Sequence, residues 1–205
     1  MATGPRYAVK FRRRREGKTD YSKRIKILQS KTLRLVVRKS NKYIVVQLVE
    51  YAPKGDKTLL TAHSSKLKEF GWQHGTKNIP AAYLTGLLAG KLAKQKKITE
   101  AVLDIGLHVS TNGAKIFAAL KGAADAGLKI NYNPKIVPSA DRLSGKHIAE
   151  HLKKQNLPAD FNAVKEKILK PELNEANLNK VQVDPSEQKS RLVQRGPAKR
   201  EVSLR

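Results

Sequence analysis

The chain has 205 residues, of which 42 are Lys or Arg and 17 are Asp or Glu, so its formal net charge at pH 7 is +25. A compact protein with this much charge of one sign repels itself, which predicts a polyanionic partner; nucleic acid is favoured and an anionic membrane surface is the alternative. The absence of Cys excludes disulfides, zinc knuckles and thiol catalysis. No apolar run approaches the roughly 20 residues of a membrane span, and residues 1–10 lack a secretory signal, so we expect a cytoplasmic protein.

Basic residues are concentrated at the N-terminus. Residues 1–42 hold 15 basic and 2 acidic side chains, residues 43–157 hold 17 and 8, and residues 158–205 hold 10 and 7. A chain segment that lies between the phosphates of a nucleic acid needs many basic residues close together, because several cations must neutralise several closely spaced anions. The run Arg12–Arg15 has no apolar periodicity, so residues 1–19 are predicted to be a basic RNA-binding arm that orders only on its partner. A nuclear-import signal or a solvated tail is the alternative.

A basic amphipathic helix is predicted to begin after Asp20, which can serve as its N-cap. Apolar residues recur with helical spacing, and basic residues lie largely elsewhere on the turn: Tyr21, Ile25 and Leu28 against Lys23, Arg24 and Lys26. A membrane surface or a calmodulin-like partner is the alternative for such a helix. The thin apolar stripe, flanked by arginines rather than Trp or Phe, favours RNA.

Three antiparallel strands in a meander are predicted over residues 32–40, 43–51 and 58–63, with turns at 40–42 and 53–56. In the first strand apolar and basic positions alternate: Leu33, Leu35 and Val37 lie on one face, and Arg34, Val36 and Arg38 lie on the other. This is the pattern of a half-buried strand whose outer face is cationic.

Helices and one more strand follow the meander. Asn78 can cap a helix with Pro80 in its first turn, and the small residues Gly86 and Gly90 on one face of that helix predict close packing against a sheet. The apolar run at 101–105 predicts a strand buried on both faces.

A second helix is predicted from about Gly113 to Ala126, with Gly127 as its C′ stop. The predicted fold class is therefore α/β: a mixed sheet, made of the antiparallel meander and a parallel buried strand, packed with helices. Residues 20–157 would form this core.

Residues 158–205 are predicted to be a C-terminal extension. Residues 160–170 indicate a helix, with Phe161, Val164 and Ile168 aligned and Pro171 ending it. Residues 186–205 hold six basic and two acidic side chains without periodicity, so a second RNA-bound tail and plain disorder both remain open.

Two patterns resemble catalytic sites. The sequence from His147 to His151 fits H-x-x-E-H, which makes a zinc hydrolase the competing hypothesis; the neighbouring Lys153 and Lys154 disfavour a dication there. A hydrolase triad could be assembled on paper from His63, Ser64, Asp104 and His108, but no G-x-S-x-G elbow frames a serine. We interpret Asp104 as a structural carboxylate. The sequence predicts no catalytic residue, no metal and no cofactor.

Six segments occur in order and at characteristic spacing: RRRREGKTDY, LVVRKSNKYIVVQ, AHSS, PAAYLTGLLAGKLA, LDIGLH and GAKIFAALKGAADAGL. Together they resemble the archaeal and eukaryotic form of the 5S-RNA-binding protein family, the eighteenth large-subunit protein in the bacterial naming. The resemblance covers roughly residues 1–150. The PAAYLTGLLAG and LDIGLH segments are closer to the archaeal type than to the bacterial type.

The resemblance implies a ribosomal protein without a catalytic role. It implies an α/β core packed against 5S rRNA in the central protuberance, beside the large-subunit rRNA and neighbouring ribosomal proteins, and a basic arm that runs along RNA. Charge and resemblance together give the candidate RNA-binding residues: Arg12, Arg13, Arg14, Arg15, Lys18, Tyr21, Lys23, Arg24, Lys26, Arg34, Arg38, Lys42, Tyr43, His63, Ser64, Ser65 and Trp72.

These candidates would act according to residue type. Arg side chains grip phosphate oxygens bidentately or stack on bases, and Lys supplies point charges. Tyr21, Tyr43 and Trp72 could stack on unpaired bases or instead pack in the core. A general DNA-compacting protein is a further alternative, because the same charge would serve it.

Overall fold

The computed structural model describes residues 4–153 and 156–170, and a four-stranded sheet lies at its centre. The strands are β1 (Arg34–Lys39), β2 (Ile44–Glu50), β3 (Lys57–His63) and β4 (Val102–Asp104). The first three form the predicted antiparallel meander, and β4 pairs in parallel with β1, so the order is β3-β2-β1-β4. The predicted α/β fold with a mixed sheet is confirmed.

The expectation that β4 is buried on both faces is wrong. This strand is an edge strand, and its residues Val102 and Leu103 are only half-buried. A short apolar run indicates a strand, but it does not reveal how completely other elements cover the two faces of that strand.

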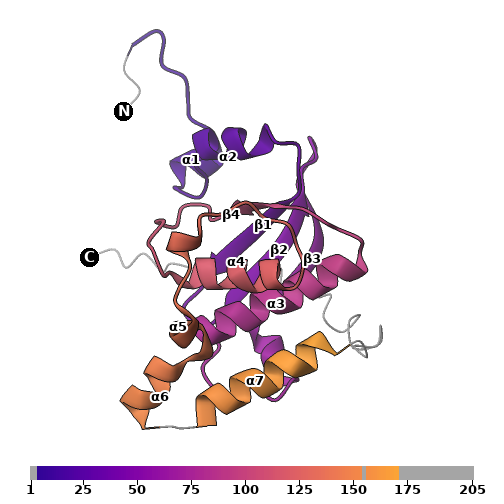
Figure 1. Cartoon of the computed structure of the whole chain (residues 1–205). Coiled ribbons are helices and arrows are strands. Elements are labelled where there is room, and N and C mark those ends of the chain that lie inside the picture. Colours follow the sequence, from indigo (N-terminus) through magenta and orange to yellow (C-terminus); the bar gives the residue numbers. More distant parts are fainter. Residues whose placement is uncertain (1–3, 154–155, 171–205) are drawn as a thin grey trace, which may run out of the picture. The chain divides into compact units, whose positions relative to one another are not determined.

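Two helices, α3 (Ile79–Gln95) and α4 (Lys115–Asp125), cover one face of the sheet (Figure 1). The Asn78 side chain caps α3 by accepting from the backbone N–H of Ala81, as the sequence predicted. Leu35 and Val37 on β1 are completely buried, and by strand alternation they share the face toward these helices. The main apolar core therefore lies between this face of the sheet and the helix layer. The expectation that β1 is half-buried is wrong, because Arg34 and Val36 on its other face are buried as well.

The glycines of α3 pack against a helix and not, as expected, against the sheet. A Cβ added at Gly86 would lie 1.9 Å from the carbonyl oxygen of Ala119, and one at Gly90 would lie 2.7 Å from that of Ala123, so both glycines face the backbone of α4. Their spacing reveals a close-packed face. It does not reveal which element covers that face.

The other helical segments of the described residues are short, except for the last helix. They are α1 (Arg12–Arg15), α2 (Tyr21–Leu28), α5 (Ala140–Ser144), α6 (Lys146–Leu152), α7 (Asn156–Leu169) and two 3₁₀ turns, η1 (Ser64–Lys68) and η2 (Pro134–Ile136). Helices α5 and α6 and the turn η2 were not predicted from the sequence.

Helix α7 packs on α3 (Figure 1). Its residues Phe161, Val164 and Ile168 are buried, which confirms the predicted apolar face, although the helix begins at Asn156, four residues earlier than expected. The Lys91 ammonium on α3 donates to the backbone carbonyls of Ile168 and Lys170 and so holds the end of α7. Pro171, predicted to end the helix, and the tail at 186–205 lie outside the described residues.

The arginine run forms one helical turn, α1, although no structure was expected there. The Phe11 ring packs on Tyr21 with 5.1 Å between ring centroids, and Arg13 Nε donates to Thr19 Oγ1 at 2.8 Å. These contacts close the turn against α2. The sequence could not show them because both depend on residues outside the arginine run.

Candidate nucleic-acid interface

Helix α2 lies over the face of the sheet that α3 and α4 leave open. The predicted N-cap is confirmed, because the Asp20 carboxylate accepts from the backbone N–H groups of Ser22 and Lys23. The predicted apolar stripe is only partly right: Ile25 is 58% exposed, whereas Ile27 is half-buried and lines the hollow between α2 and the sheet.

A hollow of about 340 Å³ lies between α1, α2, the sheet and the segment after β4. Its basic and acidic lining residues are Arg13, Lys18, Asp20, Lys23, Arg24, Arg34, Arg38, Asp56 and Asp104. It brings together six candidate residues of the predicted arm, helix and first hairpin: Arg13, Lys18, Lys23, Arg24, Arg34 and Arg38.

The base of this hollow is an arginine–aspartate network. Arg34, only 3% exposed, donates to Asp56 at 2.6 Å and to Asp104 at 3.2 Å. One terminal nitrogen of Arg24 donates to both oxygens of Asp56, at 2.8 and 2.9 Å, and Arg38 donates to Asp104 at 3.1 Å. The network therefore ties α2 to β1, to β4 and to the turn before β3.

The network is structural as well as cationic. Burial alone would raise the pKa of Asp56, but hydrogen bonds from Arg24 and Arg34 more than offset this and lower the pKa below its ordinary value. The carboxylate therefore stays ionised and the buried guanidinium of Arg34 stays paired, as a buried charge requires. Asp104 also accepts from the backbone N–H of Gly106 at 2.8 Å, so it serves as the structural carboxylate that the sequence predicted.

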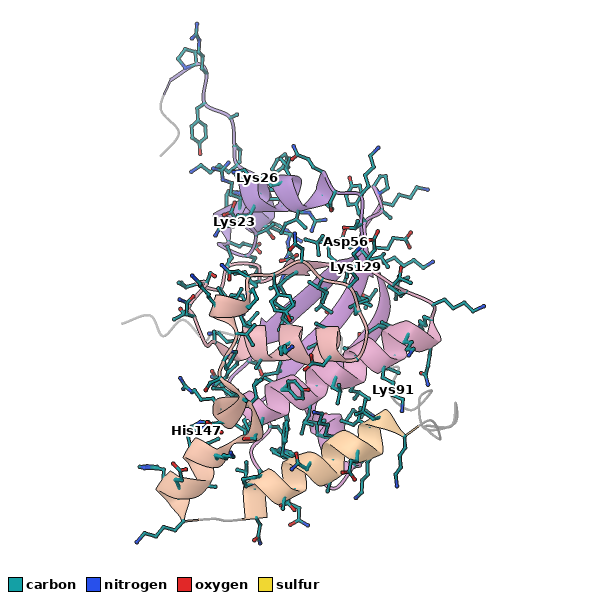
Figure 2. The ribbon with its side chains drawn as sticks, in the orientation of Figure 1. Lys23, Lys26, Asp56, Lys91, Lys129 and His147 are labelled. Carbon is teal, nitrogen blue, oxygen red and sulfur yellow. The ribbon has the colours of Figure 1, made fainter. Side chains whose placement is uncertain are left out.

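The cations of the arm and the lysines of α2 are exposed. All four side chains of Arg12–Arg15 lie at the surface, and Lys23 and Lys26 project from α2 (Figure 2). Their ion pairs, such as Lys18–Glu16 at 2.8 Å and Lys23–Asp20 at 3.7 Å, are themselves exposed. Such pairs contribute about 0–1 kcal/mol, so a phosphate can displace them at little cost.

The β1–β2 turn and the segment after β3 bring four more candidates together. The Tyr43 ring lies 4.7 Å from the His63 ring, and His63 Nδ1 is 2.6 Å from Ser65 Oγ. Burial, together with the charge of Lys66, lowers the pKa of His63, so the imidazole is neutral at pH 7. Ser64 is fully buried, and its hydroxyl accepts from the backbone N–H of Ile44 at 3.0 Å.

Trp72 is 1% exposed, and its indole N–H donates to the carbonyl of Gly75 at 3.2 Å. Like Arg34 and Ser64, it has an internal role in the fold. The exposed candidates are the ones that a partner reaches without rearrangement of the core, and for every candidate the RNA contact itself stays a prediction.

The two catalytic patterns do not assemble into sites within the described residues. His147 and His151 both lie on α6, and His147 is labelled in Figure 2. Among residues 4–153 and 156–170 no group of three or more His, Cys, Asp or Glu residues could hold a metal ion. Asp104 pairs with arginines and not with His63, whose partner is Ser65. Within these residues, no helix is both long and apolar enough to cross a membrane.

Sequence reasoning missed three residues of a second cationic surface. Lys68, Lys77 and Lys115 line a groove together with Lys42 and Tyr43, far from α2 along the chain. They come from segments distant in sequence, so no local pattern signals them.

Known proteins resemble this chain over most of its length. A family model described as ribosomal large subunit proteins 60S L5 and 50S L18 matches residues 5–98 and 90–133. The large ribosomal subunit protein uL18 of Korarchaeum cryptofilum is 51% identical over 154 residues, which are 75% of this chain and 79% of that protein. The proteins of the same name from Methanoregula boonei and Haloarcula marismortui are 54% and 52% identical, over 75% and 80% of this chain and 88% and 89% of their own lengths.

These matches confirm the resemblance to the archaeal and eukaryotic type. The chain therefore belongs to the uL18 family of large-subunit ribosomal proteins, and it is a structural, non-enzymatic component of the cytoplasmic ribosome, associated with rRNA and other ribosomal proteins.

Proposed function

We propose that the chain binds 5S rRNA through its N-terminal region and the adjoining sheet face, and that it helps attach this RNA to the large-subunit rRNA in the central protuberance. The observation that carries the proposal is the exposed cationic surface formed by Arg12–Arg15, Lys18, Lys23 and Lys26, whose ion pairs are weak ones at the surface. The choice of 5S rRNA comes from the resemblance of the six sequence segments.

Each part of this surface would bind RNA in its own way. The guanidinium groups of α1 can each take two phosphate oxygens, and the lysines of α2 supply point charges beside them. Recognition would therefore rest on phosphate neutralisation and RNA shape rather than on a long base sequence.

The arginine–aspartate network gives this surface its rigidity. Because Arg24 on α2 and Arg34 on β1 share Asp56, the cationic helix is fixed on the sheet before any partner binds. Fixing charges in advance lowers the entropic cost of binding. In this proposal residues 1–19 act as the arm and residues 20–157 as the platform that positions it.

The proposal is tested by filter binding of purified 5S rRNA at increasing salt. Neutralisation of six or more phosphates predicts that the affinity falls about a thousandfold between 50 and 200 mM salt. Salt-insensitive binding would contradict the proposal. Duplex DNA serves as competitor: DNA that competes as well as 5S rRNA would favour the DNA-compacting alternative.

Deletion of residues 1–18 tests where the binding surface lies. The deletion removes α1 but keeps the contact between Arg24 and Asp56, so the circular-dichroism spectrum of the core is expected to change little. Most of the affinity for 5S rRNA should be lost. An unchanged affinity would place the binding surface elsewhere.

A further inference from the structure

A second cationic surface lies where β1 turns into β2 and where α3 and α4 begin. We call it the lysine groove. It is open to solvent and has a volume of about 450 Å³. Its lining residues are Lys42, Tyr43, Lys68, Gly75, Thr76, Lys77, Asn78 and Lys115. Four lysines from four separate segments thus converge there, and none of the lining residues also lines the hollow under α2.

The lysines of the groove lack acidic partners. No Asp or Glu side chain of the described residues lines the groove, and none of its four lysines forms an ion pair within residues 4–153 and 156–170. Burial lowers the pKa of Lys115, and the neighbouring charges of Lys77 and Lys39 lower it further. The fold therefore holds like charges close together at a cost in stability, and a bound anion would offset that cost.

The backbone adds to the positive potential. Both α3 and α4 begin at the groove, so the positive ends of two helices lie beside the lysines. The N-cap residue of α4 is Ala114, which has no side chain able to accept from the first amides of the helix. The turn is fixed in place as well, because Thr76 Oγ1 donates to the backbone carbonyl of Lys42 at 2.8 Å.

We infer that the lysine groove binds the phosphate backbone of the large-subunit rRNA, while the N-terminal region binds 5S rRNA. The inference rests on the proposed function, because a protein that attaches one RNA to another needs two separate cationic surfaces. Closely spaced phosphates match lysines that converge from several segments, since each lysine supplies a point charge without a fixed geometry. Among the residues that line the groove, the Tyr43 ring is the only large apolar group, which disfavours a protein side chain as the occupant.

The test uses the full chain in which Lys68, Lys77 and Lys115 are all replaced by Gln. Lys42 and Tyr43 are left unchanged because they are also candidate contacts to 5S rRNA. The matched control replaces three other lysines by Gln: Lys94, Lys129 and Lys135. These lysines are exposed, line neither surface and form no ion pair among the described residues. Each protein is titrated with 5S rRNA alone, with large-subunit rRNA alone, and with large-subunit rRNA after saturation with 5S rRNA.

The groove variant should bind large-subunit rRNA at least about tenfold more weakly than the control, and its salt dependence should be shallower by about two to three phosphate contacts. Its affinity for 5S rRNA should stay within about twofold of the control. Equal affinity of both variants for large-subunit rRNA would overturn the inference. In that case an acidic polyglutamate chain is tested as well. If only the groove variant fails to bind it, the groove belongs to a protein partner.

Equal losses for both RNAs would also overturn the inference, because the groove would then be part of the 5S surface. Failure of the proposed function has a different signature, since the unmodified chain would not bind 5S rRNA in the first titration. The titration with large-subunit rRNA alone tests the groove in either case.

Discussion

The hollow under α2 and the lysine groove are both cationic, but their charges are organised in opposite ways. In the hollow, three arginines share two aspartates, and the central one, Arg34, is almost completely buried. In the groove, four lysines converge without an acidic partner among the described residues. Positive charge therefore has two uses in this protein: paired arginines hold the fold together, and unpaired cations are available to phosphates.

Removing a carboxylate from the arginine–aspartate network should cost the most stability. Asp104→Ala leaves the buried Arg34 without one of its carboxylates, so the free energy of unfolding should fall by about 3–5 kcal/mol in urea denaturation. Asp104→Asn, which keeps the size of the side chain, should lose most of the same stability. A loss below about 1 kcal/mol would show that the network is not structural.

Replacing the exposed arginines of α1 should lower the affinity for RNA without lowering the free energy of unfolding. Replacing all four residues of Arg12–Arg15 by Gln should weaken 5S rRNA binding by at least about tenfold at 100 mM salt, because up to four phosphate contacts are lost. Replacement by Lys keeps the charge, so the salt dependence should persist while the bidentate contacts are lost. A fall in the unfolding free energy equal to that of Asp104→Ala would erase the distinction between the two uses.

Acid should lower the free energy of unfolding by protonating Asp56 in the arginine–aspartate network. The folded pKa of this carboxyl lies below its ordinary value of 3.8, so its contribution to stability is fully present above that value and is lost as the pH falls through it toward the folded pKa. Asp56→Asn should remove this part of the acid dependence of the unfolding free energy. Identical pH profiles for the two proteins below pH 5 would contradict the role assigned to Asp56.

The smallest effect has the opposite sign. In the absence of RNA, replacing Lys68, Lys77 and Lys115 by Gln should leave the free energy of unfolding unchanged or raise it by up to about 0.5 kcal/mol, because mutual repulsion is relieved. Urea denaturation beside the Asp104→Ala variant measures this difference. A loss of more than about 1 kcal/mol would mean that these lysines support the fold.

Local signals predicted the elements of the core. The Asn78 cap, the Gly127 stop and the alternation along β1 each act through residues near in sequence, so the meander, α3 and α4 could be located from the sequence. The α/β class followed from their order.

Features that depend on distant residues could not be predicted. The partner of Gly86 is α4, more than thirty residues later, and the helical turn of α1 depends on a contact between Phe11 and Tyr21. For the candidate site, the sequence located the exposed arm but treated Arg34 and Trp72 as reachable, although the fold buries both. A charge count gives the number of cations, but only the three-dimensional arrangement shows which of them are paired.

The most direct test of these two uses of charge is an electron cryo-microscopy map of the large subunit that contains this protein. We expect RNA phosphates within about 4 Å of the Arg12–Arg15 guanidinium groups and of the Lys77 and Lys115 ammonium groups, with Arg34 still bound to Asp56 and Asp104. Arginines and lysines that face solvent with no nucleotide nearby would contradict this expectation.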